Sequence, residues 1–145
     1  MAAPTVEVRV TRHFDDSMEK VFNAWTDAET AGKWLFATPT GQMVRAEIDP
    51  RVGGSFIFVD RRNGEDIEHT GDYVELVPPR RLVFDFGVPK YTTEKTRVTI
   101  EIAPEASGCQ LTLTHDGVWA EYETRTTQGW NMLLDGLAAT LQSAR

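Results

Sequence analysis

The C-terminal stretch, residues 120–143, constrains the fold of this chain more than any other. It contains no proline, and its large apolar side chains recur at the three-and-four spacing of a helix with one apolar side. These side chains are Trp130, Leu133, Leu134, Leu137 and Leu141. The spacing predicts a long amphipathic helix, and the rest of the chain must supply a large surface that covers its apolar stripe.

The preceding sequence predicts such a surface in the form of a β-sheet. Residues 5–14 alternate between apolar and polar, which indicates a half-buried strand. Capping-box sequences that begin at Asp16 and Thr26 then predict two short helices in tandem. Six further strands are predicted over residues 42–48, 55–60, 67–77, 81–86, 96–103 and 110–115. Because short turns join consecutive strands, we expect an antiparallel sheet with one apolar face, curled around the terminal helix.

Length and composition fit one globular domain over residues 1–145, with 41% hydrophobic and 26% charged residues. No apolar run approaches the roughly 20 residues that span a bilayer, and the first residues lack the pattern of a secretory signal. We therefore expect a cytoplasmic protein with no membrane partner. The net charge of −7 argues against nucleic acid as a partner, and the single cysteine, Cys109, excludes an internal disulfide.

Several motifs, in their order along most of the chain, resemble one known family. They lie at residues 21–27 with Trp34, at 49–56, 71–73, 78–84 and 111–115, and at 129–130 with Leu133 and Leu137. They resemble the START-like (SRPBCC) superfamily and, within it, the family of the activator of Hsp90 ATPase homologue 1. The resemblance implies an α+β helix-grip fold of the Bet v 1-like kind. In that fold a curved antiparallel sheet of seven strands follows the order above, and a long C-terminal helix packs across it.

A curled sheet that holds one helix tends to leave space at its open end, and apolar pockets with a few polar groups are where small molecules bind. Tyr73 and His115 would supply polar groups there, and Trp119 would stand near the mouth. For any single aromatic residue, simple filling of the core is the alternative. The candidate cavity-lining residues are Trp34, Phe56, Phe58, His69, Tyr73, Phe84, Phe86, His115, Trp119, Glu123, Trp130 and Leu134.

The titratable candidates leave two interpretations open. His69 and His115 are each either buried and hydrogen-bonded or in polar contact with a cavity. Glu123 either faces the cavity mouth or lies exposed in the first helical turn, where negative charge suits the helix dipole. No spacing enforces a metal site on the histidines, and no phosphate-binding loop, nucleophile elbow or zinc-protease motif occurs, so we expect neither metal nor cofactor.

Three functions follow from these expectations. The first is binding of a small hydrophobic or aromatic molecule. The second is a protein-interaction role, implied by the family resemblance, with a chaperone or a second copy of the chain as partner. Met132, outside the apolar stripe, is a candidate for such a surface. The third is an enzyme similar to polyketide cyclases and aromatases. No spacing in the sequence brings two acid–base candidates into contact, and this argues against catalysis.

Overall fold

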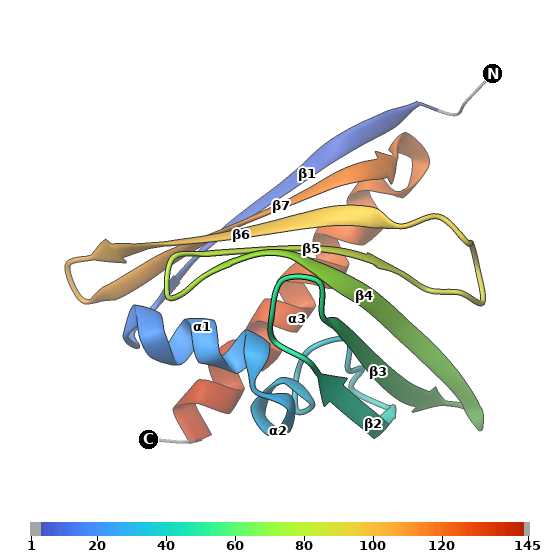
Figure 1. The fold of residues 1–145 in the computed structure, drawn as a ribbon, viewed down its shortest axis with the longest axis horizontal. Coiled ribbons are helices and arrows are strands. Elements are labelled where there is room, and N and C mark those ends of the chain that lie inside the picture. The colour runs from blue at the N-terminus through green and yellow to red at the C-terminus, as the bar shows by residue number, and fades with distance from the viewer. Residues whose placement is uncertain (1–3, 144–145) are drawn as a thin grey trace.

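One antiparallel sheet forms the framework of the molecule. The computed structural model describes residues 4–143. Its seven strands are β1 (Thr5–Phe14), β2 (Gln42–Ile48), β3 (Ser55–Arg62), β4 (Glu65–Val77), β5 (Arg81–Gly87), β6 (Thr96–Glu105) and β7 (Gly108–Trp119). They lie side by side in the order β1-β7-β6-β5-β4-β3-β2, so β1 closes onto the last strand and the others form a meander (Figure 1). All seven predicted strands are confirmed, and most extend one to four residues beyond the predicted ends.

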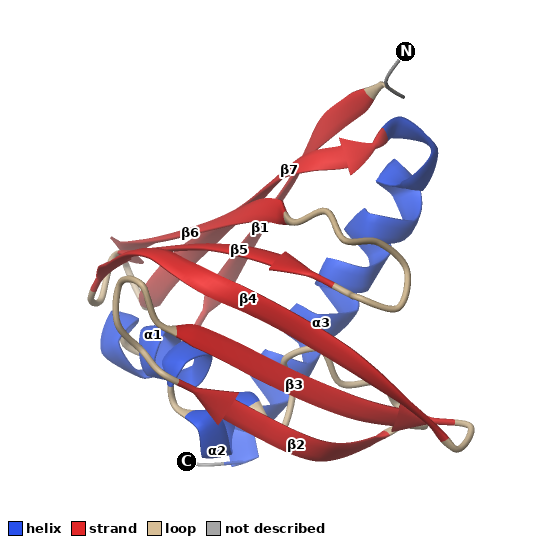
Figure 2. Ribbon diagram, turned by 45° about the vertical axis from the view of Figure 1, so that its right-hand side comes forward, coloured by secondary structure: helices blue, strands red, loops and turns tan. Residues whose placement is uncertain are grey.

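The helices all lie on the same side of this sheet (Figure 2). The long helix α3 (Glu123–Ser143) follows a single turn of 3-10 helix, η1 (Ala120–Tyr122), so the predicted helix starts three residues later than expected. Its predicted stripe is buried at Trp130, Leu134, Leu137 and Leu141, against the inner face of the sheet. The predicted helix-grip α+β fold is therefore confirmed. No helix of residues 4–143 combines the length and apolar character that crossing a membrane requires.

Two short helices, α1 (Met18–Thr26) and α2 (Ala28–Ala31), close one end of the grip. Both begin one residue later than the sequence predicted. The N-cap of α1 is Ser17, whose hydroxyl accepts the Lys20 N–H, and that of α2 is Asp27, whose carboxylate accepts the Thr30 N–H. Asp27 replaces Thr26 in this role because Thr26 is still part of α1. The hydrogen bonds from the hydroxyl and N–H of Thr30 lower the pKa of Asp27.

At this closed end the side chains are tightly packed. Trp25 and Trp34 meet edge to face, with ring centroids 4.7 Å apart, and the Trp34 indole N–H donates to the Ala24 carbonyl at 3.1 Å. Gly136 of α3 lies next to Trp34, where an added Cβ would be 3.4 Å from the Trp34 Cβ. The lack of a side chain at Gly136 thus allows α3 to approach Trp34 closely. We call this end of the interior the closed half.

Candidate functional site

A cleft opens at the other end of the grip, between the start of α3 and the connection from β5 to β6. It consists of a larger hollow of about 500 Å³ and a smaller one of about 300 Å³, which share His69, Phe86, Val88, His115 and Thr126. The larger hollow is also bordered by residues Gly87, Tyr91, Thr92, Glu94, Thr96, Gly117, Val118, Trp119, Tyr122 and Arg125. The smaller one is also bordered by Phe36, Ala37, Thr38, Arg62, Gly129, Trp130, Met132 and Leu133. Neither set includes a residue of α1 or α2, and we call this end the open half.

His115 is the polar centre of the cleft wall. It follows Leu111 and Leu113 on the inner face of β7 and is only 6% exposed. Its Nδ1 lies 3.0 Å from the indole nitrogen of Trp130 on α3, and its Nε2 lies 2.7 Å from the hydroxyl of Thr96 on β6. The two alternatives left open for His115 are therefore both realised, because it is buried and hydrogen-bonded and also borders the cleft.

The hydrogen bond from Trp130 fixes the protonation state of His115. An indole N–H can only donate, so Nδ1 of His115 must accept and carries no proton. The ring is then neutral with its proton on Nε2, which donates to the oxygen of Thr96. Burial has the same effect, since loss of hydration disfavours the charged ring and lowers the pKa of His115 to about 4. At neutral pH this histidine is therefore an uncharged link between helix and sheet.

His69 lies on the neighbouring part of the wall, on β4, and is 7% exposed. Its ring stacks on that of Phe36, with centroids 4.7 Å apart and planes 13° from parallel. Desolvation, with a smaller contribution from the positive charge of Arg62, lowers the pKa of His69 to about 4. Among the described residues its Nδ1 has no hydrogen-bond partner. His69 thus also presents a neutral ring to the cleft.

Phe36 joins the cleft to the core, and the sequence did not single it out. Its backbone has a positive φ of 60°, which costs a residue with a side chain about 1–3 kcal/mol and is often found where ligands bind. Its ring meets five others, those of Phe56, Phe58, His69, Phe86 and Trp130. No periodic pattern extends over this connection, so no sequence signal was available to place the ring.

An ion pair between a buried carboxylate and a half-buried guanidinium holds this connection in place. Asp60 on β3 is 1% exposed, and one of its carboxylate oxygens accepts from the Thr38 hydroxyl at 2.9 Å and from the Arg62 guanidinium at 2.8 Å. Arg62 also donates to the Phe36 carbonyl at 3.2 Å. Because Arg62 is held by Asp60 and by the Phe36 carbonyl, its guanidinium forms a fixed part of the wall of the smaller hollow. The carboxylate of Asp60 neutralises its charge.

The rim of the cleft carries a concentration of large exposed apolar side chains. Four of the seven large apolar side chains that are exposed in residues 4–143 border it, namely Tyr91, Trp119, Tyr122 and Met132. Trp119 and Tyr122 stack with centroids 5.8 Å apart, and the Arg125 guanidinium lies 5.6 Å from the Tyr122 ring centre. Exposed apolar residues that gather in one place mark sites of interaction more often than scattered ones do.

The structure brings together only part of the predicted cavity lining. His69, Phe86, His115, Trp119 and Trp130 border the cleft. The remaining aromatic and aliphatic candidates, Trp34, Phe56, Phe58, Tyr73, Phe84 and Leu134, are buried in the core and border neither hollow.

Two polar candidates lie outside the cleft. Tyr73 does not supply a polar group to the cleft, because it lies further along β4, 4% exposed and against Phe56. Burial there raises its pKa. Glu123 is exposed as the first residue of α3, in agreement with the helix-dipole interpretation.

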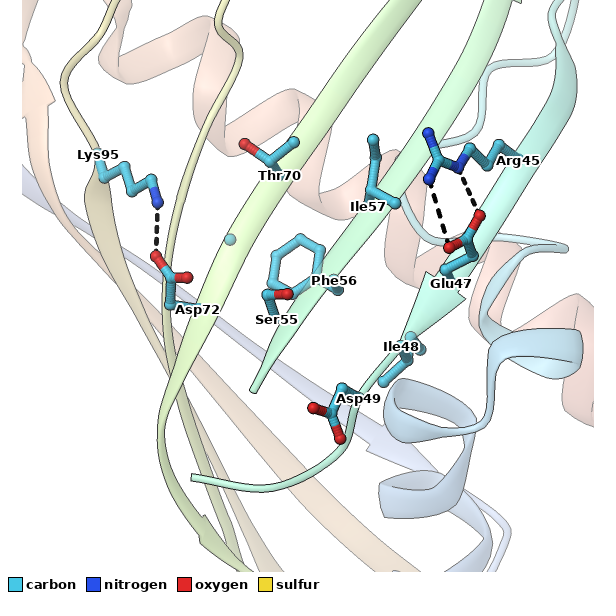
Figure 3. A pocket seen from close by; sticks show the side chains of 11 residues that line it. Arg45, Glu47, Ile48, Asp49, Ser55, Phe56, Ile57, Thr70, Asp72 and Lys95 are labelled. Carbon is cyan, nitrogen blue, oxygen red and sulfur yellow. Dashed lines mark hydrogen bonds and ion pairs between the residues drawn. The ribbon is translucent and has the colours of Figure 1, made fainter. Parts of the chain in front are cut away.

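A further groove of about 440 Å³ lies on the face of β2, β3 and β4 that is turned away from α3 (Figure 3). Four of its charged side chains are paired with one another, Arg45 with Glu47 at 2.5 Å and Lys95 with Asp72 at 2.5 Å. These pairs are solvent-exposed, and such pairs contribute little on their own. The groove therefore has the character of an ordinary charged surface.

The described residues contain no group of three or more histidine, cysteine, aspartate and glutamate side chains that could hold a metal ion. The third histidine, His13, lies on the surface between two carboxylates, Glu105 and Asp15, and its hydrogen bonds to them raise its pKa. The most important group that the sequence did not single out is Thr96. It lies two residues before Val98, so the alternation along this strand places it on the inner face.

Comparison with solved structures supports the fold. Protein CV1439 from Chromobacterium violaceum superimposes with a TM-score of 0.84 at 26% identity, over 92% of this chain and 94% of that chain. Protein SA2116 from Staphylococcus aureus gives a TM-score of 0.88 at 20% identity, over 98% and 96% of the two chains. The AHSA1-like protein from Aeromonas hydrophila gives 0.82 at 21% identity, over 96% and 94%.

A search of curated proteins gave no match. The family model described as activator of Hsp90 ATPase homolog 1-like protein, in contrast, matches residues 15–142, which include every element from α1 to α3 apart from the last residue of α3. Together with the helix-grip architecture, this match confirms the resemblance seen in the sequence. The chain belongs to the activator of Hsp90 ATPase homolog 1-like family.

Proposed function

We propose that this protein binds a small hydrophobic or aromatic molecule in the cleft, and that it does so in the cytoplasm. The observation that carries the proposal is the cleft itself, whose larger hollow of about 500 Å³ is within the range of small-molecule sites. Six aromatic or imidazole rings border that hollow, and its buried histidines, His69 and His115, and the partly buried hydroxyl of Thr96 are uncharged. An apolar wall with a few fixed polar groups favours an apolar ligand held in one orientation.

An enzyme similar to polyketide cyclases is less well supported by the same geometry. His115 is the only histidine hydrogen-bonded to a hydroxyl in the cleft, but the nitrogen that faces Thr96 already carries the proton. It therefore cannot take a proton from that hydroxyl, as a general base would have to do. Of the other candidates for acid–base chemistry, His69 borders the cleft, whereas Tyr73 and Glu123 do not.

A chaperone-associated role is the second candidate, favoured by the exposed rim. Tyr91, Trp119 and Tyr122 are exposed without a cover, as docking residues of a protein interface often are. Purified Hsp90 and this protein should then associate at micromolar concentration, and Trp119→Ala should weaken the complex. Unchanged association of the Trp119→Ala protein would show that the rim is not the docking surface.

The binding proposal is tested with N-phenyl-1-naphthylamine, a neutral probe that becomes fluorescent in apolar sites. We expect saturable binding to the native protein and its loss in Thr126→Trp, because residue 126 borders both hollows and a large ring there fills the cleft. Gln128→Trp is the matched control, since it adds the same ring to an exposed position of the same helix. Absence of binding to the native protein, or equal binding to both variants, would refute the proposal.

A further inference from the structure

We infer that the ligand of the cleft is a neutral aromatic carbonyl compound, whose carbonyl oxygen accepts a hydrogen bond from the Thr96 hydroxyl. This inference rests on the proposed binding function and makes it chemically specific. It follows from the direction of the hydrogen bonds that run from α3 through β7 to β6, and from the rings and charges that border the larger hollow.

The direction of the chain of hydrogen bonds is set at its buried end. The Trp130 indole can only donate, so His115 accepts at Nδ1 and donates from Nε2 to the oxygen of Thr96. The single proton of the Thr96 hydroxyl must then point away from His115. Among residues 4–143, no acceptor is recorded for that proton, although Thr96 is only partly exposed and borders the larger hollow.

A donor without a partner at the wall of an apolar hollow selects its ligand. A ligand with an acceptor at that place satisfies the donor, whereas a pure hydrocarbon leaves it without water and without a partner. The acceptor of His115 is already used by Trp130, so His115 offers nothing further to a ligand donor. A carbonyl oxygen, which only accepts, is the simplest complement of this wall.

The other groups of the larger hollow favour a ring system without net charge. Six rings border it, those of His69, Phe86, Tyr91, His115, Trp119 and Tyr122. Rings of this kind prefer to pack against flat π-systems.

The charged side chains at the larger hollow are one of each sign, Arg125 and Glu94, both exposed. In the adjoining smaller hollow, Arg62 is paired with Asp60. The two histidines are neutral at neutral pH. The lining therefore has no excess of charge that would favour an ionic ligand.

The test compares 2-acetylnaphthalene with 2-isopropenylnaphthalene, which replaces the carbonyl oxygen by a methylene group and keeps the ring system and a side group of nearly the same size. Dissociation constants are measured by calorimetry for the native protein and for Thr96→Val, which keeps a β-branched residue in the strand. We expect Thr96→Val to weaken the ketone by roughly three- to tenfold, the worth of one hydrogen bond, and to change the alkene by less than about twofold. Thr99→Val is the matched control, since Thr99 lies on the same strand but borders neither hollow, and it should change neither.

Thr96→Ser, which keeps the hydroxyl, should retain the preference for the ketone and guards against loss of folding in Thr96→Val. Equal weakening of both compounds by Thr96→Val, or loss of the preference in Thr96→Ser, would overturn the inference. If N-phenyl-1-naphthylamine binds in the cleft but Thr96→Val leaves the ketone unaffected, only the carbonyl inference falls. If neither naphthalene nor that probe binds, the binding function falls with it.

Discussion

The two halves of the interior differ although the same sheet and the same helix form both. In the closed half, α1 and α2 cover the grip, and Trp25, Trp34 and Leu137 are at most 2% exposed. In the open half the space between sheet and helix is left to the cleft, and Trp119 is 40% exposed. The difference shows that the sheet alone does not determine which part of the interior is packed with side chains. The short helices close only one end of the grip, so only that end is closely packed (Figure 1).

The halves also differ in what their buried polar groups do. The Trp34 indole donates to the backbone of α1, and this hydrogen bond joins α1 to the segment that follows α2. The Trp130 indole instead donates to His115, which in turn donates to the hydroxyl oxygen of Thr96 at the cleft. We therefore expect mutations in the closed half to affect mainly stability, and mutations in the open half to affect mainly binding.

The largest effect should come from Trp34→Ala in the closed half. It removes a ring that packs against Trp25 and the donor to the Ala24 carbonyl, so the free energy of unfolding should fall by about 3–5 kcal/mol. Urea denaturation at neutral pH measures this loss. Trp34→Phe, which keeps an aromatic ring, should lose less, and a loss below about 1 kcal/mol for the alanine variant would mean that the closed half is not tightly packed.

Low pH should destabilise the protein through the two histidines of the open half. The pKa values of His69 and His115 are about 4 in the folded protein against 6.5 for an ordinary histidine. As the pH falls below 6.5 the unfolded chain binds protons first, so stability that is present above pH 6.5 is lost towards pH 4. By about pH 5 the loss should reach roughly 2 kcal/mol for each histidine.

Urea denaturation at pH 7.5 and pH 5 checks this sign and its origin. His115→Leu should remove about half of the difference between the two pH values. The surface residue His13 acts in the opposite direction, because its raised pKa gives a contribution that is lost as the pH rises through its folded value. Equal stability at both pH values would show that the two cleft histidines are hydrated in solution.

The link between the helix and the sheet should be measurable at neutral pH. His115→Leu leaves the Trp130 indole N–H buried without an acceptor, which should lower the free energy of unfolding by about 1–3 kcal/mol. The same change in a Trp130→Phe background should cost less, because the donor is already gone. Equal costs in both backgrounds would contradict the hydrogen bond between the two side chains.

The smallest change in stability is expected at the rim. Trp119→Ala removes a ring that is 40% exposed, so the free energy of unfolding should change by less than about 1 kcal/mol. Affinity for N-phenyl-1-naphthylamine should nevertheless fall, since Trp119 borders the larger hollow. A large loss of stability in this variant would mean that the open half is part of the packed core.

The sequence predicted the faces of the elements well and their positions in space poorly. The alternation of Leu111, Leu113 and His115 correctly placed His115 on the inner face, because a strand has a period of two residues. The same rule put Tyr73 inside, but it does not tell how far along the sheet a residue lies. Tyr73 therefore belongs to the packed core and not to the cleft.

The contacts that give the cleft its chemistry depend on three-dimensional assembly. The pairing of β6 with β7 and the packing of α3 onto the sheet together bring Thr96, His115 and Trp130 into one chain of hydrogen bonds. Local sequence patterns do not contain that register. Phe36 was missed for a related reason, since its ring is placed by a connection with a positive φ and not by a repeating pattern.

Gly129 of α3 links the capacity of the cleft to the stability of the helix. It borders the smaller hollow, and a methyl group added there would meet no heavy atom within 4 Å. Inside a helix, alanine is favoured over glycine by about 1 kcal/mol. Alanine in place of Gly129 would therefore stabilise α3 and reduce the volume of the smaller hollow. A search for heat-resistant variants that selects alanine at this position would at the same time select against the bulkiest ligands.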